Sequence, residues 1–527
     1  MLRARTNEQE GQDRRAVFKT AMIWSLLGLA AYAVLRTVFR LPHRKSDSAP
    51  GQRPVPPSTL SRIFVHLAED AERGSAIYPL LEGKSAFAAR MMLIDLAEHA
   101  IDVQYYIWRD DLTGLLLLER LRAAAERGVR VRLLLDDNGV AGLDPILAEL
   151  DAHPDIAVRL YNPFVIRRPR LLNYLFDFLR LNRRMHNKSI TYDGALTITG
   201  GRNIGDEYFD TGDNPLFVDL DVIAAGQAAR AVAGAFELYW NSRSAYRLGT
   251  VVPLAVGKAG ALETALAEKR RSAQFHRFSE AMASDPITRD LVERRLTLEP
   301  ARALLVCDAP DKTLGSVLSG DLLVGQLKEL LDEVEHRLDL VSPYFVPGKQ
   351  GVAEFLRLAR RGAKVRVLTN SLEANDVALV HAGYRKYRRR LLKGGVELLE
   401  LKAGSAPPSR GGQGPGIGSS GSSLHAKTFS ADGRLIFIGS FNFDPRSVWL
   451  NTEMGLVIES EGLAGRMHTT MENQLADRAY RVSLDARGRM QWEDRETGEV
   501  FRSDPHSGII KRAAIFALGL LPIEWLL

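Results

Sequence analysis

Two short strings of matched spacing contain the side chains of this sequence that are best suited to chemistry. Both fit the pattern HxKxxxxDG, and an asparagine follows each histidine at the same interval of seventeen residues. The candidate catalytic residues are His186, Lys188, Asp193, His425, Lys427 and Asp432. A single match is typical of a half-buried strand with incidental polar residues, whereas a duplicate at matched spacing favours a functional pair of motifs.

The residue types in each string indicate a phosphate site. In the segment HxK on a strand, the histidine and the lysine lie on one face and can reach one point. Lysine supplies a fixed cation, and asparagine donates a hydrogen bond to a phosphate oxygen. If two such strands face each other, one neutral imidazole can attack phosphorus while the protonated second imidazole donates to the leaving oxygen. The reaction would then proceed in two steps through a phosphohistidine.

Further phosphate-binding candidates lie at the end of each string. They are Asn203, Asn442 and Ser440. Small residues beside each asparagine allow the backbone to approach an oxyanion. Two imidazoles, two lysines and two asparagines already supply the charge and the donors that a divalent ion supplies in other phosphoryl-transfer enzymes. We therefore expect neither a metal ion nor another cofactor.

The elements around the two strings also repeat. Residues 101–137 read as an alternating apolar strand, a helix-period stretch and a second strand, and residues 338–371 repeat this order. The turn from helix to strand carries Arg127-Gly128 in the first half and Arg361-Gly362 in the second. Each βαβ unit implies parallel strands joined by a right-handed crossover. The sequence therefore predicts an α/β protein of two similar lobes, with helices on both faces of each sheet.

The expected division of the chain follows from the repeats and from composition. An N-terminal membrane anchor (1–45) and a linker rich in proline and serine (46–60) precede the first lobe (61–256). A charged, helix-prone connector (257–302) leads to the second lobe (303–490), and a C-terminal tail (491–527) follows. The second lobe includes the glycine- and serine-rich stretch 403–423, which we expect to be a mobile loop.

Both ends of the chain are apolar. Residues 20–35 carry no charge, and flanking apolar residues extend this run to the length of roughly 20 residues that a membrane-spanning helix needs. Arg36 follows directly and no small-x-small cleavage site ends the run, which favours an uncleaved anchor over a signal peptide. Basic residues on both sides leave its orientation open. The tail carries Lys511 and Trp525, which are typical of a membrane interface, although a helix packed on the body would be equally apolar.

Composition limits the class of protein. With 527 residues, 46% of them hydrophobic and 25% charged, the chain is globular rather than disordered. A net charge of +6 suits a protein that works near the phosphates of nucleic acid or of anionic lipid. The single cysteine, Cys307, excludes an internal disulfide and a zinc site built from several cysteines.

On these motifs the sequence resembles the phospholipase D superfamily, whose hallmark is HxKxxxxD given twice. The resemblance covers residues 77–479 and includes AIDVQYYIW, RLNRRMHNKS, GGRNIGDEYF, SLHAKTFS and IGSFNFDPRS. These stretches are similar to bacterial cardiolipin synthases of the short, C-type branch. The resemblance implies two phospholipase D-like lobes in one chain, each a mixed β-sheet flanked by helices, with the active site between them.

The resemblance also implies a role for each site residue. His186 would be the nucleophile and His425 the general acid and base, while the lysines and asparagines hold phosphate. The two motif aspartates are more often structural in the family. A downstream acid orients each histidine there, and Asp221 for His186 and Glu453 for His425 stand in suitable places. Longer cardiolipin synthases tend to have two membrane helices before the catalytic body, whereas this sequence has one.

The implied function is that of a phosphatidyltransferase that forms cardiolipin, with phosphatidylglycerol as the acceptor. The expected partners are phospholipids (phosphatidylglycerol, phosphatidylethanolamine or cardiolipin) at a bacterial inner membrane. No nucleic acid is expected, and the need for a protein partner stays open. Two alternatives remain, namely a phospholipase D-type phosphodiesterase that hydrolyses phospholipids and a lipid-binding scaffold without catalysis. The anchor favours lipid over nucleic acid, and the two intact motifs argue against the scaffold.

Overall fold

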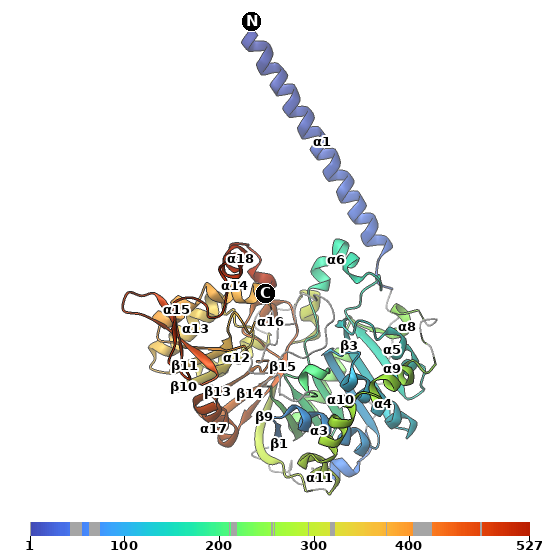
Figure 1. Cartoon of the computed structure of the whole chain (residues 1–527). Helices are drawn as coiled ribbons and strands as arrows, with labels where there is room; N and C mark the ends of the chain where they lie inside the picture. Colours follow the sequence, from blue (N-terminus) through green and yellow to red (C-terminus); the bar gives the residue numbers. More distant parts are fainter. Residues whose placement is uncertain are drawn as a thin grey trace.

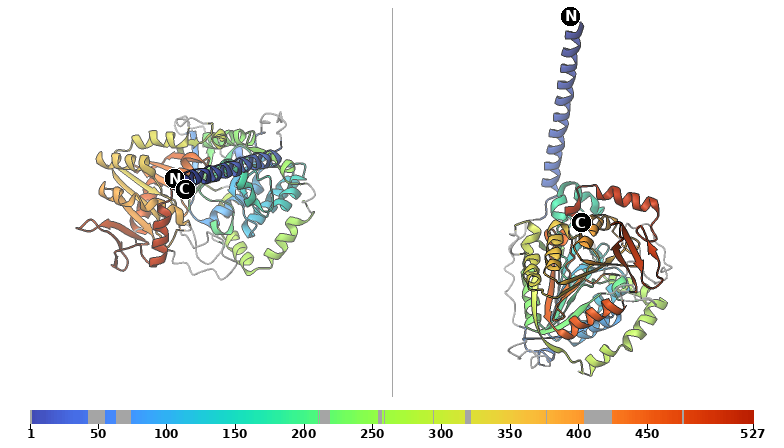
Figure 2. Two further views of the ribbon diagram at one scale, coloured as in Figure 1. Left: turned by 90° about the horizontal axis from the view of Figure 1, so that it is seen from above. Right: turned by 90° about the vertical axis from the view of Figure 1, so that its left-hand side faces the viewer.

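The structure, a computed structural model, describes residues 2–42, 55–62, 74–209, 211, 219–253, 257, 259–293, 295–316, 322–375, 377–403, 424–474 and 477–527. Most of the expected linker 46–60 lies outside these residues, and so does the stretch 404–423 of the glycine- and serine-rich segment. The described part forms a two-lobed body from which one long helix projects (Figures 1 and 2).

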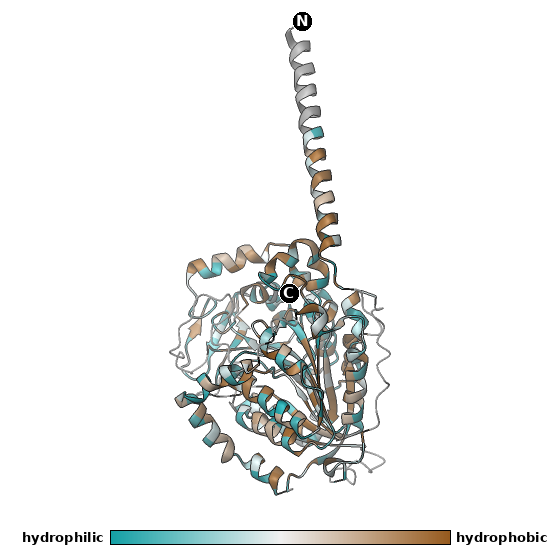
Figure 3. Ribbon diagram, turned by 90° about the vertical axis from the view of Figure 1, so that its right-hand side faces the viewer, coloured by the Kyte–Doolittle hydropathy of each residue, from teal (hydrophilic) through white to brown (hydrophobic). Residues whose placement is uncertain are grey.

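The projecting helix is α1 (Leu2–Val38). Its segment Phe18–Val38 has a mean hydropathy of 1.6, and none of it is buried. It is therefore long and apolar enough to cross a membrane. Figure 3 shows apolar colouring along this part of α1 down to its junction with the body. The prediction of an apolar N-terminal helix is confirmed.

The first lobe is built on a mixed sheet, as predicted. Its strands are β1 (Gly74–Leu80), β2 (Ala100–Ile107), β3 (Arg130–Gly139), β4 (Ile156–Tyr161), β5 (Ser189–Tyr192), β6 (Leu196–Gly200), β7 (Asp221–Gly226) and β8 (Ala245–Arg247). They pair in the order β8-β4-β3-β2-β5-β6-β7-β1. β2, β3 and β4 run parallel, and the other pairs are antiparallel.

The second lobe repeats this order. Its strands are β9 (Glu299–Cys307), β10 (Arg337–Val341), β11 (Lys364–Asn370), β12 (Glu397–Leu401), β13 (Thr428–Ala431), β14 (Leu435–Gly439), β15 (Met454–Glu459), β16 (Ala479–Leu484), β17 (Met490–Asp494) and β18 (Val500–Phe501). They pair as β9-β15-β14-β13-β10-β11-β12-β16-β17-β18. Read from β1 and from β9, the two lobes have the same strand sequence over their shared length. The predicted internal repeat is confirmed.

The two sheets meet at β1 and β9, which pair antiparallel with Ser75 opposite Ala301. Next to this seam, Val222 of β7 belongs to the same buried apolar cluster as Ile436 and Ile438 of β14. Burial of apolar surface stabilises a fold by roughly 25 cal/mol per Å². This shared cluster therefore fixes the lobes against each other and brings equivalent strands of the two lobes together.

Helices cover both faces of the first sheet. Its larger helices are α3 (Gly83–Leu96), α4 (Leu112–Glu126), α5 (Asp144–Asp151) and α7 (Gln227–Trp240). On β3, Leu133 and Leu135 belong to the cluster that contains α3 and α4, whereas Leu134 packs with Phe236 of α7. Because alternate residues of a strand point to opposite faces, these helices lie on opposite sides of the sheet.

The second lobe has matching helices and a matching turn. Its helices include α12 (Leu323–Asp332), α13 (Gly348–Arg360), α14 (Ala378–Arg385), α15 (Arg388–Lys393) and α17 (Glu461–Thr469). After α4 and after α13, the chain turns at Gly128 and Gly362, with φ of 91° and 96°. Only glycine adopts this backbone conformation readily, which explains the repeated Arg-Gly dipeptide.

Two domain boundaries differ from the expected ones. The connector contains α9 (Ala261–Arg270), α10 (Ala273–Ala283) and α11 (Pro286–Val292), but β9 begins at Glu299, inside the range 257–302. The tail 491–527 is not separate from the second lobe, because β17 and β18 extend its sheet beyond β16. Strand pairing satisfies the backbone groups of these residues and so ties them to the lobe.

The remaining elements of the described chain are η1 (Arg170–Asn173), α6 (Tyr174–Leu181), η2 (Asp206–Tyr208), α8 (Leu248–Val251), η4 (Pro310–Leu314), α16 (Pro445–Trp449), η6 (Thr470–Gln474), α18 (Ile509–Gly519) and η7 (Glu524–Leu526). Figure 1 shows α6, α16 and α18 on the side of the body from which α1 projects.

Candidate active site

The two histidine-lysine pairs lie directly before two equivalent strands. His186 and Lys188 precede β5, and His425 and Lys427 precede β13. In each pair the lysine Nζ donates to the backbone oxygen of its histidine, at 2.7 Å for Lys188 and 2.6 Å for Lys427. The two side chains of each pair therefore lie on one side of the backbone, as the spacing HxK predicts.

Each histidine is held by a carboxylate from the other lobe. The Nδ1 atom of His186 lies 2.8 Å from Oε2 of Glu453, and Nδ1 of His425 lies 2.6 Å from Oδ2 of Asp219. Both carboxylates are fully buried. The paired Nδ1 leaves Nε2 of each ring as the atom that can react. The crossing of the pairs also places both histidines at the boundary between the lobes.

Backbone contacts between the lobes explain one half of this crossing. The segment before β5 forms a bridge with the segment before β15, between Met185 and Thr452. The backbone N–H of His186 donates to the oxygen of Thr452, at 2.9 Å. Because Glu453 directly follows Thr452, its side chain lies beside His186. The expected pairing of Glu453 with His425 is therefore wrong, although Glu453 does hold a histidine.

The expected role of Asp221 is also wrong. Its carboxylate accepts from Nη2 of Arg90 at 2.8 Å and from the backbone N–H of Arg202 at 3.2 Å, and these groups are buried in the first lobe. The acid that meets a histidine is Asp219, two residues earlier. Glu453 stands one residue before β15 and Asp219 two residues before β7, whereas Asp221 is the first residue of β7 and contacts Arg90 of α3. An acidic residue just before the corresponding strand of each lobe, β7 and β15, is the sequence feature that could have identified Asp219.

The hydroxyl of Ser440 binds the carboxylate of Glu453. Its hydroxyl donates to Oε2 of Glu453, and the hydroxyl of Ser447 donates to Oε1 at 2.8 Å. Two donated hydrogen bonds fix the orientation of a buried carboxylate. The candidate role of the Ser440 hydroxyl in holding phosphate is therefore not supported, because that hydroxyl is used within the protein.

The two asparagines differ in what they contact. Oδ1 of Asn203 accepts from the backbone N–H of Ile107 at 3.2 Å, and Nδ2 donates to the hydroxyl of Tyr208 at 3.2 Å. The amide nitrogen carries two hydrogens, so one remains for a phosphate oxygen. Asn442 is buried, and its Oδ1 has no hydrogen-bond partner within the described chain. Phosphate binding by both asparagines stays a prediction.

The motif aspartates build turns and do not reach the histidines. Asp193 accepts from the backbone N–H groups of residues 98–100, at 2.8 to 3.0 Å. Asp432 accepts from those of residues 335–337, at 2.7 to 2.9 Å. Both aspartates have a positive φ, 51° and 52°, at the turn between two strands. Their inclusion among the catalytic candidates is corrected: the aspartate of each motif ties its hairpin to the start of β2 or β10.

The surroundings of the two histidines differ in charge. Burial, together with the charges of Lys188 and Lys427, lowers the pKa of His186 well below its ordinary value. Burial and Lys427 also lower the pKa of His425, to about 4, but here the charge of Asp219 acts against the decrease. Burial raises the pKa of Glu453 to about 7 and lowers that of Lys188 to about 7.

Two tyrosines that sequence reasoning missed pack against the imidazoles. Tyr106 meets His186 edge to face, with ring centroids 4.9 Å apart, and Tyr208 meets His425 in the same way at 5.0 Å. Such contacts fix a ring in one orientation. Both tyrosines come from the first lobe, so no repeat in the sequence indicated them.

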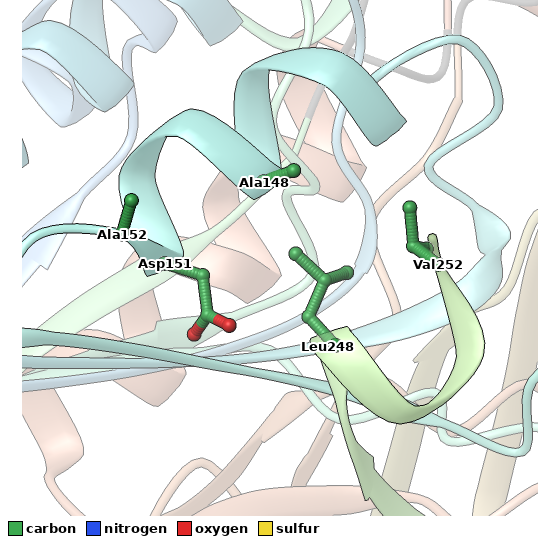
Figure 4. Close-up of a pocket in the computed structure, with 6 residues that line it drawn as sticks. Ala148, Asp151, Ala152, Leu248 and Val252 are labelled. Carbon is green, nitrogen blue, oxygen red and sulfur yellow. The ribbon is translucent and has the colours of Figure 1, made fainter. Parts of the chain in front are cut away.

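Among the residues that the structure describes, no three histidines, cysteines, aspartates or glutamates come together in a group that could hold a metal ion. A small hollow elsewhere is shown in Figure 4 and is lined by Ala148, Asp151, Ala152, Leu248, Gly249 and Val252. The carboxylate of Asp151 accepts a hydrogen bond from the backbone N–H of Val158 and therefore has a structural role. We do not assign a catalytic function to this hollow.

Two similar lobes of mixed sheet, each with an HxKxxxxD string and with both histidines at the boundary, define a phospholipase D-type enzyme fold. A family model described as "Cardiolipin synthase, PLD-like domain" matches residues 91–240 and 327–475, one copy in each lobe. The chain belongs to this family of cardiolipin synthase, phospholipase D-like domains.

Individual relatives agree with this placement. The chain is 48% identical to cardiolipin synthase C of Escherichia coli strain K12 over 453 residues, which cover 86% of this chain and 96% of the relative. It is 26% identical to a cardiolipin synthase of Geobacillus kaustophilus over 412 residues, 77% of this chain and 66% of the relative. The crystal structure of a phosphatidylserine synthase from Haemophilus influenzae matches with a TM-score of 0.55 and 15% identity, over 89% of this chain and all of that one. At this identity the match shows the fold.

Proposed function

We propose that this protein is a cardiolipin synthase that transfers a phosphatidyl group to phosphatidylglycerol through a phosphohistidine. The observation that carries the proposal is the crossed arrangement of two histidine-carboxylate pairs, each with a buried carboxylate and with a lysine beside the histidine. Two imidazoles supply a nucleophile and a general acid, and two ammonium groups supply positive charge for a phosphate.

The charges around the histidines support His186 as the nucleophile. Burial and the charges of Lys188 and Lys427 lower the pKa of His186 well below its ordinary value, so its ring is neutral. Nδ1 of this neutral ring donates to the carboxylate of Glu453, which leaves the free electron pair on Nε2. Burial acts to raise the pKa of Asp219, but the charges of His425 and Arg202 outweigh it and hold that pKa low. An ionised carboxylate stabilises the imidazolium, so His425 suits the role of general acid.

The reaction balances in two displacements. In the first, Nε2 of His186 attacks phosphorus, the bond from phosphorus to the headgroup oxygen breaks, and His425 gives its proton to that oxygen. In the second, a hydroxyl of phosphatidylglycerol attacks the phosphorus of the phosphohistidine and gives its proton to His425, and the P–N bond breaks. Cardiolipin leaves, and both histidines return to their starting states. Phosphatidylglycerol, phosphatidylethanolamine or cardiolipin can supply the phosphatidyl group in this scheme.

The apolar helix α1 supports a place in a membrane, and we propose the bacterial inner membrane, where these lipids are synthesised. The positive net charge of +6 favours anionic lipid surfaces.

The direct test uses the full chain, purified and placed in nanodiscs of defined lipids with isotopically distinct headgroups. Mass spectrometry of the products should show cardiolipin and the released headgroup alcohol, and variants His186→Ala and His425→Ala should form neither. Phosphatidic acid as the main product would assign hydrolysis instead of transfer. Absence of any product with every donor would contradict the proposed function.

A further inference from the structure

Two short helices beside the active site expose large apolar side chains. In η1 and α6, Leu171, Leu175 and Leu179 are 65 to 78% exposed. In α18 and the turn after it, the exposed side chains are those of Ile509, Ile510, Phe516 and Leu520, at 59 to 86%. Single exposed apolar residues are common on proteins, but contiguous apolar faces mark sites of interaction.

Each helix is attached to the body by its other face. Phe176 and Leu181 of α6 are buried. Ile515 of α18 is 2% exposed and packs with Leu372 and Ala382 of the second lobe. The two helices are thus fixed in place while their outward faces remain apolar. A helix on a surface that faces only water carries polar residues on its outward face.

Both outward faces lie at the end of the body from which α1 projects, with α6 next to the base of α1 and α18 farther from it (Figure 1). Phe39, directly after α1, stacks on Phe176 of α6 with ring centroids 5.3 Å apart. Figures 1 and 2 show α6 and α18 at the end of the body from which α1 projects. In Figure 3 the apolar colouring of α1 continues onto the helices beside its base.

We propose that the outward faces of η1–α6 and of α18 dock into the interfacial layer of the bilayer that α1 enters. They form a two-helix docking platform that holds the active site against the lipid headgroups. This inference deepens the proposed function and rests on it for the lipid nature of the substrate. A bilayer is the occupant because the apolar segment Phe18–Val38 ends at this side of the body, so a membrane that contains it lies next to the platform (Figure 1).

The charges around the platform match an anionic lipid surface. Residues 509–519 include Lys511 and Arg512 and no acidic residue. The guanidinium of Arg385 lies over the ring of Phe516, 5.8 Å from its centroid, so a cation stands at the edge of the apolar face. Arg168, two residues before η1, is also an exposed cation. Cations at the rim of an apolar face are typical of helices that lie in a membrane interface.

One side chain connects the platform to the catalytic loop. Nη1 of Arg446 donates to the backbone oxygen of Asn182, directly after α6, and its Nε donates to that of Leu526, after α18, both at 3.1 Å. Arg446 lies four residues after Asn442, and α6 ends five residues before His186. Docking of both helices therefore directs the boundary between the lobes, where the histidines lie, toward the membrane surface.

Depth measurements in a bilayer test the platform independently of activity. The full chain first receives the substitution Cys307→Ser, which removes its native thiol. One new cysteine is then introduced per variant, by Leu175→Cys, Ile510→Cys or Val292→Cys, and an environment-sensitive fluorophore is attached to it. The control Val292 is 57% exposed on α11, at the opposite end of the body (Figure 1). In nanodiscs of phosphatidylglycerol and phosphatidylethanolamine with spin-labelled lipid, the labels at 175 and 510 should be quenched and the label at 292 should not.

The platform is contradicted if the label at either helix is quenched no more than the label at 292. That result includes the outcome in which another protein, rather than lipid, covers these faces. Quenching at one helix alone would also overturn the two-helix arrangement.

An activity comparison separates docking from chemistry. The double variant Leu175→Asp, Leu179→Asp should lose activity on nanodisc phosphatidylglycerol by about tenfold for each leucine, because burial of one leucine changes an equilibrium constant by about that factor. It should retain activity toward dissolved short-chain phosphatidylglycerol, and Val292→Asp should match the wild type on both. Equal loss on both substrates would contradict docking. If the wild type forms no cardiolipin from either substrate, the proposed function fails, whereas the quenching result still decides the platform.

Discussion

Replacing Asp219 with asparagine removes the negative charge that faces His425 and keeps the shape of the side chain. The carboxylate is fully buried and lies 2.6 Å from Nδ1 of His425. A hydrogen bond to a charged group contributes about 1.5–3 kcal/mol, which corresponds to a loss of about 10- to 150-fold in rate if it acts in the transition state. If the ring also adopts the wrong tautomer, the loss approaches the ~10⁴-fold effect known for the acid of a Ser-His-Asp triad.

The assay is cardiolipin formation per folded enzyme, measured as a function of pH. Because the charge of Asp219 acts to raise the pKa of His425, its removal should also shift the activity profile toward lower pH. A role in folding alone would lower the melting temperature without moving this profile. The matched variant is Asp221→Asn, two residues away, which should destabilise the protein by removing the buried negative charge that faces Arg90.

The crossed pairing would be refuted by either of two results. The first is a folded Asp219→Asn variant with wild-type activity and an unchanged pH profile. The second is an Asp221→Asn variant whose folded fraction has lost its activity, because the structure places Asp221 against Arg90 and away from both histidines.

Three further predictions follow from the site. The pKa of Lys188 is about 7 and that of His425 about 4, and both side chains must be protonated to act. We therefore expect kcat/KM to fall as the pH rises from 6 to 8. A rise over this range would contradict the roles assigned to Lys188 and His425. Chelator should leave activity unchanged, because imidazoles and ammonium groups already supply the charge at phosphate, and inhibition by EDTA that magnesium or zinc reverses would show otherwise. Asp432→Ala should lower stability by about 1–3 kcal/mol, by calorimetry, because three backbone N–H groups lose their acceptor, while kcat per folded enzyme stays near the wild-type value.

The duplicated motif made the two-lobed fold predictable, because a repeat of strand, helix and strand beside each HxK string specifies equivalent sheets. The same repeat misled the assignment of the orienting acids. It suggested that each lobe supplies its own acid, whereas the bridge between Met185 and Thr452 places Glu453 beside the histidine of the other lobe. Contacts across a lobe boundary depend on tertiary packing, and no spacing within one half of the chain encodes them.

Two other features could not be deduced from residue types alone. Ser440 looked suited to phosphate because it stands beside Asn442, but the fold directs its hydroxyl to Glu453. The exposed position of the leucines of α6, with Leu175 69% exposed, had no counterpart among the sequence predictions. In both instances the direction of the side chain is fixed by neighbours distant in the sequence.

The central claim, a phosphohistidine at His186, is tested most directly by trapping that intermediate. A phosphatidyl p-nitrophenyl ester has a leaving group that needs no proton, so the first displacement does not require His425. The variant His425→Ala should therefore release p-nitrophenol in a single stoichiometric burst and accumulate the phosphatidyl group on His186, as identified by peptide mass spectrometry after an alkaline quench. The variant His186→Ala should give no burst. A burst from His186→Ala with the phosphatidyl group on His425, or the absence of an adduct in both variants, would contradict the mechanism.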